Sequence, residues 1–306
     1  MKATPQTTAA PRRILVPVDF SEPSRQALVA AIALAHRFGA RLAVAHITRR
    51  NRPDSHVAAE LVGIDFDTRR AVQAKLQEFI DREVPGDIQP ARLVADGVPF
   101  DEIAKTVDAW EADLVVIATH GYTGLKHALL GSTAERVVRH APCPVLVVRN
   151  RKIRGVTRVF SADEIGSILV PVDFSESSLV ALQHALALAR KFDARLCLLH
   201  VVEPFHPDML IDTTESRREA RMAAHQRLRR LADATKRVWP RTGRELRPGN
   251  PVAIIAAMAR RTNADLIVMG THGRTGLKGA LAGSVAERVV RSAPCSVLTV
   301  RTATKR

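Results

Sequence analysis

A spaced glycine pattern occurs twice in this chain and is its clearest candidate for binding chemistry. The first copy reads Ala118-Thr119-His120-Gly121, then nine residues, then Gly131-Ser132. The second reads Gly270-Thr271-His272-Gly273, then nine residues, then Gly283-Ser284. Glycine has no Cβ, so backbone N–H groups can approach a ligand closely, and the amides at a helix start favour an anion. The pattern therefore predicts a phosphate-binding loop in each half.

The last part of each pattern also has a purely structural interpretation. Ser132-Thr133-Ala134-Glu135 and Ser284-Val285-Ala286-Glu287 both fit the capping box, in which serine and glutamate side chains satisfy helix amides. The two interpretations are compatible, because a hydroxyl can cap a helix while neighbouring amides face an anion. The sequence leaves both open.

Other polar residues accompany the glycines without forming a recognisable catalytic set. Asp19 and Asp173 fit either a hydrogen bond to a base or ribose, or a turn. The chain lacks the GxxxxGK(S/T) motif, and no GxGxxG follows its first apolar segment. Four histidines have neither the nucleophile that a triad needs nor the spacing of metal ligands, and are interpreted as structural: His46, His120, His200 and His272. We therefore expect no catalytic residue and no metal site built from protein ligands.

Apolar strands alternating with helices must position these residues. In the first half, apolar runs predict strands at 13–18, 42–47, 92–95, 113–118 and 145–148. Helical patterns fill the intervals, with Ser21 as the N-cap of the first helix and Gly39 as its end. This alternation predicts an α/β fold with parallel βαβ units in an open doubly wound sheet. Ligands of such sheets bind beyond the carboxyl ends of the strands, where 17–19, 46–47 and 118–132 should converge.

The second half repeats the first. Residues 14–47 align with 168–201 at 21 of 34 identities, and residues 113–149 align with 265–301 at 27 of 37. Self-similarity over a whole half predicts two copies of one domain of ordinary size. We place the first domain at 11–149, a linker at 150–166 and the second domain at 167–302.

Composition excludes several classes of protein. Three scattered cysteines fit a reducing cytosol rather than a disulfide framework, and Cys143 and Cys295 are expected to be small buried residues. The amino-terminal residues lack the apolar segment of a signal peptide, and no stretch approaches a membrane span. The chain has a net charge of +15, and its richest basic run lies at 217–244. This arginine-rich run has a helical pattern with Met222, Leu228 and Leu231 as its apolar positions. Trp239 is the one aromatic residue in this run, and a single ring does not make a series of base-stacking platforms, so the run is interpreted as a solvated face and nucleic acid is not an expected partner.

The combined motifs resemble the universal stress protein family. The glycine pattern, the segment Val-Pro-Val-Asp-Phe-Ser that starts at Val16 and at Val170, and the segment Ala-Pro-Cys before the last strand carry this resemblance over nearly all of both halves. The resemblance implies two tandem Rossmann-like domains, each an open five-stranded parallel sheet with helices on both faces. It also implies that each domain binds ATP without being an efficient enzyme.

The resemblance places the adenine site at Asp173 and Val201, and the ribose and phosphate contacts on the glycine pattern. The family pattern has glycine at the position of Ala118, so we expect weaker ATP binding in the first domain. The predicted nucleotide-binding residues of the first domain are Pro17, Val18, Asp19, Ile47, Ala118, His120, Gly121, Gly131, Ser132 and Thr133. Those of the second domain are Pro171, Val172, Asp173, Val201, Met269, Gly270, His272, Gly273, Gly283, Ser284 and Val285.

The expected function is that of a cytoplasmic ATP-binding regulator or sensor in a stress response, with Mg²⁺ or Mn²⁺ accompanying the phosphates. The alternative is a basic interaction protein with vestigial nucleotide sites, acting through protein or polyanion contacts. If strand order follows the family, 145–148 and 297–300 lie at sheet edges. An unpaired apolar edge favours association, so we expect the domains to pair within the chain and whole chains to form a homodimer.

Overall fold

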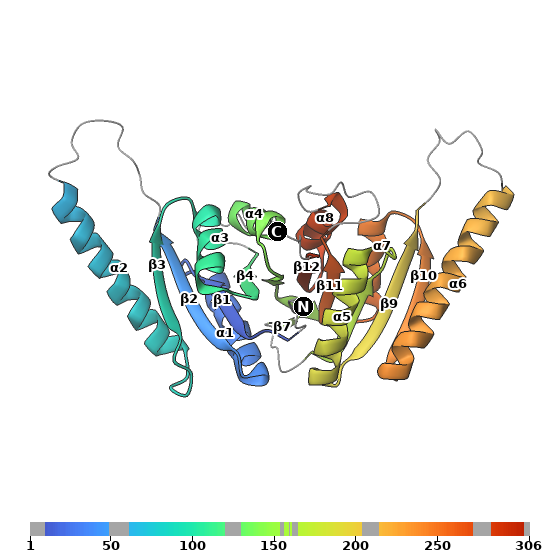
Figure 1. Ribbon diagram of the computed structural model, residues 1–306, viewed down its shortest axis with the longest axis horizontal. Coiled ribbons are helices and arrows are strands. Elements are labelled where there is room, and N and C mark those ends of the chain that lie inside the picture. The colour runs from blue at the N-terminus through green and yellow to red at the C-terminus, as the bar shows by residue number, and fades with distance from the viewer. Residues whose placement is uncertain are drawn as a thin grey trace, which may run out of the picture. The chain divides into compact units, whose positions relative to one another are not determined.

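The computed structural model describes residues 10–48, 61–119, 130–153, 156–158, 160, 165–203, 214–271 and 283–302. The chain divides into two compact units, an N-terminal unit from Pro11 to Val148 and a C-terminal unit that contains Arg149 to Arg306. Each unit is a parallel α/β sheet with helices on both faces, as predicted (Figure 1).

Strands and helices alternate in the described part of the N-terminal unit. Its elements are β1 (Arg13–Pro17), α1 (Glu22–Phe38), β2 (Arg41–Thr48), α2 (Leu61–Glu83), β3 (Ala91–Asp96), α3 (Pro99–Trp110), β4 (Leu114–Ala118), α4 (Ser132–His140) and β5 (Val145–Val148). The strand order within the unit is β5-β4-β1-β2-β3. Helices α1 and α2 pack on one face of the sheet, and α3 packs with α4 on the other.

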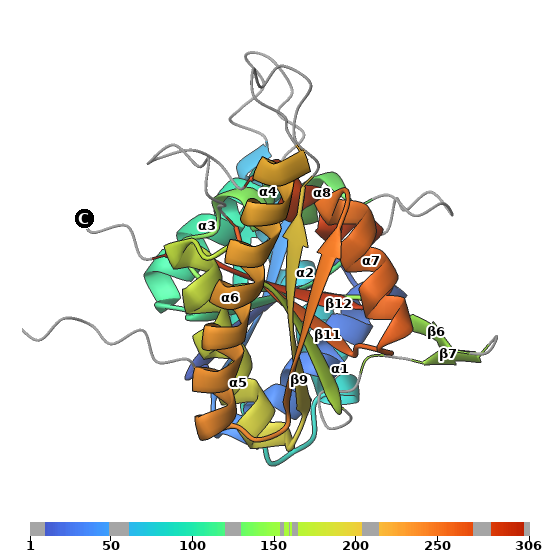
Figure 2. The ribbon, with the colours of Figure 1, turned by 90° about the vertical axis from the view of Figure 1, so that its right-hand side faces the viewer.

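The C-terminal unit repeats this plan after a short hairpin. The hairpin strands β6 (Arg151–Ile153) and β7 (Val156–Arg158) lie in the segment predicted as the linker and form an antiparallel pair of their own (Figure 2). The remaining elements are β8 (Ser167–Pro171), α5 (Glu176–Phe192), β9 (Arg195–Val202), α6 (Thr214–Val238), β10 (Thr242–Pro248), α7 (Pro251–Arg261), β11 (Leu266–Gly270), α8 (Ser284–Ser292) and β12 (Ser296–Val300). The order is β10-β9-β8-β11-β12, and α6 covers β9 and β10.

Local sequence signals explain the first helix of each unit. Ser21 is the N-cap of α1, and its side chain accepts a hydrogen bond from the Ser24 amide. Gly39 ends the helix with φ 65°, in the left-handed region that glycine adopts without strain. Both predictions are confirmed. In α5 the equivalent N-cap is Ser175, while the left-handed C-cap residue is Asp193.

The central strands form the core, as expected for strands covered on both faces. Ile14, Leu15, Ile168 and Leu169 are completely buried. Cys143 and Cys295 are buried, which confirms their expected role as small core residues. The helix expected for the arginine-rich run is present as α6, in which Leu228 is 1% exposed whereas Met222 is 62% exposed.

Candidate functional site

Each sheet opens between its first and fourth strands. β1 pairs with β4 only through Ile14 and Leu15, and β8 pairs with β11 only through Ile168 and Leu169. Toward their carboxyl ends the first strands keep pairing with the second strands alone, as far as Pro17 and Pro171. The strand order reverses at this opening, which is the position where doubly wound sheets bind ligands.

The loop after the first strand is fixed by its own aspartate. Asp19 Oδ1 accepts a hydrogen bond from the Ser21 amide at 3.1 Å, and Asp173 Oδ1 accepts one from the Ser175 amide at 3.0 Å. The serine hydroxyls donate to the same oxygens. One carboxylate oxygen of each aspartate therefore bonds within the turn, which confirms the turn interpretation. These bonds also set the orientation of the carboxylate.

A phenylalanine in an unusual backbone conformation follows each aspartate. Phe20 has φ 62° and Phe174 has φ 65°, a region that bulky residues rarely occupy and that costs conformational energy. The rings lie against His46 and His200, with centroid distances of 4.4 and 4.5 Å. The same strained conformation in both units indicates that the surrounding packing requires it.

The histidines in turn hold the backbone of the first-strand loop. The Nδ1 atoms of His46 and His200 lie 2.8 and 2.6 Å from the carbonyl oxygens of Val18 and Val172. Because a carbonyl can only accept, Nδ1 carries the proton and donates it. The histidines are therefore structural, as predicted, and they fix the backbone from which Asp19 or Asp173 projects.

In each unit a cationic side chain of the second helix lies over the phenylalanine ring. Lys75 Nζ lies 4.6 Å from the centre of the Phe20 ring, and Arg227 Cζ lies 4.3 Å from that of Phe174. Sequence reasoning missed these four residues. The repeated Val-Asp-Phe-Ser segment could have identified the phenylalanines, but the helix residues lie where the two halves hardly match.

The fourth-strand side of the opening ends in a helix start. Gly131 and Gly283 are the N-caps of α4 and α8, and neither helix has a side-chain hydrogen bond at its cap. The capping-box prediction is therefore wrong, because Ser132 and Ser284 already lie inside the helices as their first residues. First-turn amides without a side-chain cap suit an anion.

These helix starts are tied to the ends of the fourth strands. The Gly131 amide donates to the Thr119 carbonyl at 2.7 Å, and the Gly283 amide donates to the Thr271 carbonyl at 2.5 Å. The starts of α4 and α8 are therefore held beside the ends of the fourth strands, next to the opening. His120, Gly121, His272 and Gly273 lie outside the described residues.

The remaining predicted residues divide by burial. Ile47 and Val201 are partly exposed next to the first-strand loop, and Ser132, Thr133, Ser284 and Val285 are exposed or partly exposed on the first helical turns. Pro171 and Gly270 are partly exposed at the ends of β8 and β11. Five side chains belong instead to the core, so that a ligand would meet chiefly their backbone: Pro17, Val18, Ala118, Val172 and Met269.

A packing contact that the sequence did not indicate explains why residue 270 is glycine. Its φ lies outside the left-handed region, so the turn does not require glycine there. A Cβ on Gly270 would instead lie 2.6 Å from Ser177 Oγ and 2.8 Å from the Ser177 carbonyl carbon, both in α5. The close approach of helix and strand therefore accounts for this glycine without a ligand.

Comparisons with known proteins agree with the resemblance seen in the sequence. The model of the universal stress protein family matches residues 11–149 and 164–301. A universal stress protein of Methanocaldococcus jannaschii is 37% identical over 141 residues, covering 44% of this chain and 81% of that protein. The crystal structure of a universal stress protein from Archaeoglobus fulgidus covers 94% of this chain and 96% of its own, with a TM-score of 0.64 and 20% identity.

A further solved structure is of a universal stress protein in complex with cAMP. It is 26% identical, covers 44% of this chain and 96% of its own, and has a TM-score of 0.36. None of the helices in the described ranges is long and apolar enough to cross a membrane.

Proposed function

This chain belongs to the universal stress protein family, and we propose that each of its two domains binds ATP as a regulatory ligand. The observation that carries the proposal is the pair of uncapped helix starts at Gly131 and Gly283, each beside the opening between the first and fourth strands. An anion placed there would accept hydrogen bonds from backbone amides and gain from the helix dipole.

The first-strand loop supplies the other half of the proposed site. Asp173 is held by its turn, and the backbone under it is held by His200. We assign the adenine to this loop and to Val201, and the ribose and phosphates to the glycine loop and the first turn of α8. The N-terminal domain uses Asp19, Ile47 and the first turn of α4 in the same way.

Binding rather than turnover is the proposed role. Within the described ranges, no group of three His, Cys, Asp or Glu side chains is arranged to hold a metal ion. A Mg²⁺ or Mn²⁺ ion would therefore arrive with the phosphates, and the chemistry it would supply is neutralisation of their charge. The protein residues bind and orient the nucleotide, and no general base is assigned. We further propose a cytoplasmic location, a homodimer and a protein partner that reads the nucleotide state.

The experiment is calorimetric titration of the full chain with ATP. We expect two sites in the unaltered protein, one after Gly283→Glu, one after Gly131→Glu and none when both changes are combined. A glutamate at either N-cap would place a negative charge where the phosphates bind.

Gly283→Ala is the matched control for Gly283→Glu. Gly283 has φ −61° and ψ 146°, which any residue adopts, so alanine tests backbone substitution without adding charge. We expect the alanine variant to keep most of the affinity. Unchanged ATP binding in Gly283→Glu, with the circular dichroism spectrum also unchanged, would contradict the site. Nucleotide turnover with Mg²⁺ at rates typical of metabolic enzymes would contradict the regulatory role.

A further inference from the structure

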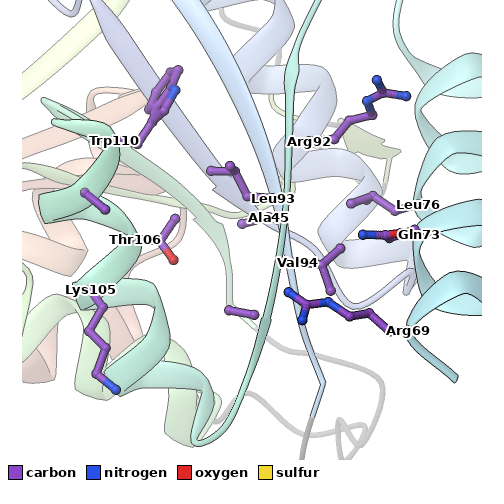
Figure 3. Close-up of a pocket in the computed structure, with 12 residues that line it drawn as sticks. Ala45, Arg69, Gln73, Leu76, Arg92, Leu93, Val94, Lys105, Thr106 and Trp110 are labelled. Atoms are coloured by element: carbon purple, nitrogen blue, oxygen red, sulfur yellow. The ribbon is translucent and has the colours of Figure 1, made fainter. Parts of the chain in front are cut away.

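A groove lies along the outermost strand of each unit, beside the second helix. In the C-terminal unit it has a volume of about 860 Å³, and Arg221, His225, Leu228, Arg244 and Leu246 are among its lining residues. The groove of the N-terminal unit has a volume of about 760 Å³ and extends to the other side of β3, where Lys105, Thr106 and Trp110 of α3 line it (Figure 3). The repeat places Arg69, Gln73, Leu76, Arg92 and Val94 at the equivalent positions, all of which line that groove (Figure 3).

The two grooves are built alike where the second helix faces the outermost strand. Leu76 and Leu228 form a buried floor, each 1% exposed, and Val94 and Leu246 are partly exposed beside them. Figure 3 shows Arg69 and Gln73 extending from α2 toward β3, with Arg92 between the same two elements. In the C-terminal unit the exposed side chain of Met222 adds apolar surface to the lining. An apolar floor between arginines suits a ligand that carries both apolar and acidic groups.

The strand that forms one wall also offers its backbone. The Arg241 carbonyl and the Gly249 amide, which flank β10, both bond toward β9. Because backbone groups alternate in direction along a strand, the N–H and C=O groups of Arg244 and Leu246 point to the outer edge. Among the described residues, β10 pairs with β9 alone. The residues that line the groove therefore also present the backbone groups to which a further strand could bond.

Charge distinguishes the two grooves. Residues 214–248, which form α6 and β10, include eleven Arg or Lys and four Asp or Glu, whereas the equivalent residues 62–96 include five and seven. Arg244 and Arg229 each lie 3.6 Å from the half-exposed Asp233, and surface pairs of this kind contribute little stability. An acidic partner could therefore replace Asp233 at Arg244 at small cost. The groove of the C-terminal unit therefore has the more positive surroundings and the greater electrostatic complementarity to an acidic ligand.

We propose that the groove between α6 and β10 binds an extended acidic segment of a partner protein, which adds to β10 as a further strand. Acidic side chains of the segment contact Arg218, Arg221 and Arg244, and its apolar side chains contact Leu228 and Leu246. The described lining of the groove contains no Phe, Tyr or Trp side chain on which bases could stack, which favours a polypeptide over nucleic acid.

The test measures binding of a fluorescent peptide of alternating glutamate and valine to the full chain by anisotropy. We expect Arg221→Glu combined with Arg244→Glu to weaken binding by roughly tenfold or more, because two attractive charge pairs become repulsive. The matched control is Arg69→Glu combined with Arg92→Glu in the N-terminal unit, which should leave peptide affinity unchanged.

A second pair of variants tests strand addition itself. Leu246→Ala removes apolar surface but keeps the outward N–H, whereas Leu246→Pro also removes that N–H without breaking the bonds to β9. We expect the proline variant to bind much more weakly than the alanine variant, with both retaining ATP binding and the circular dichroism spectrum of the unaltered protein.

Three results would overturn the proposal. The first is equal binding of a peptide in which lysine replaces glutamate. The second is equal loss of affinity from the N-terminal and C-terminal arginine changes. The third is displacement of the peptide by single-stranded DNA that binds more tightly, because that would identify the surface as a nucleic-acid site.

Discussion

A Cβ atom built on Gly270 would lie 2.8 Å from the carbonyl carbon of Ser177. Real Cβ atoms do not approach backbone atoms so closely, so β11 and α5 meet at a distance that only glycine permits. The repeat places Ala118 and Pro23 at the equivalent positions of β4 and α1. Because Ala118 carries a Cβ, the close contact made by Gly270 is specific to the C-terminal domain.

We predict that Gly270→Ala destabilises the C-terminal domain. The new methyl group must displace the backbone of α5, and overpacking of this kind costs about 1–3 kcal/mol. Urea unfolding followed by circular dichroism measures the effect. The reciprocal change Ala118→Gly removes a methyl group without creating a collision. It should therefore lower the free energy of unfolding of the N-terminal domain by a smaller amount. A Gly270→Ala protein as stable as the unaltered one would mean that the helix shifts freely.

The close contact between Gly270 and Ser177 also leads to a prediction about ATP affinity at the N-terminal site. The sequence suggested that Ala118 weakens the N-terminal site, but the packing of α5 already accounts for glycine at the equivalent position. We therefore expect Ala118→Gly to change ATP affinity at the N-terminal site by less than about twofold, or about 0.4 kcal/mol. Calorimetry in a Gly283→Glu background isolates that site. A clear gain in affinity would restore the interpretation of Ala118 as a ligand contact.

His184 predicts a dependence of stability on pH. The side chain is 7% exposed, its Nε2 has no hydrogen-bond partner among the described residues, and burial lowers its pKa. Below the unfolded-state pKa of 6.5, the unfolded chain binds a proton that the folded domain does not. Stability of the C-terminal domain should therefore fall as the pH drops from 7 toward 5, by at most about 1.4 kcal/mol per pH unit from this residue.

The matched variant is His184→Ala, because the equivalent position of the N-terminal domain is Ala30. This variant loses packing at every pH, but the difference between its unfolding free energies at pH 7 and pH 5 should be smaller. Urea titrations at the two pH values measure that difference. An unchanged difference would assign the pH dependence to other groups.

Two cysteine thiols are predicted to be unreactive in the folded protein. Burial raises the pKa of Cys143 to about 12 and that of Cys197 to about 11. At pH 8 the reactive thiolate is therefore a very small fraction of each. Mass spectrometry after iodoacetamide treatment should show these cysteines unmodified in buffer and modified in urea. Rapid modification in the native protein would contradict the burial of Cys143, and for the partly exposed Cys197 it would contradict the raised pKa.

Local signals allowed much of the fold to be predicted, since they act over only a few residues. Ser21 and Gly39 delimit the first helix as expected, because a capping hydroxyl and a left-handed glycine act within a single turn. The capping boxes failed for the opposite reason. The Thr119 carbonyl, twelve residues earlier, accepts a hydrogen bond from the Gly131 amide and fixes Gly131 rather than Ser132 as the cap.

The sequence by itself determined the repeat, the alternation of strands and helices and the edge at which a ligand would bind, because periodicity and repeated motifs are properties of the linear chain. Only the tertiary structure decided how that edge is built. The stacking of Phe20 on His46 joins a loop to a neighbouring strand, and Arg227 reaches Phe174 from a helix where the halves hardly match. Such contacts depend on distances between elements, and the sequence does not contain those distances.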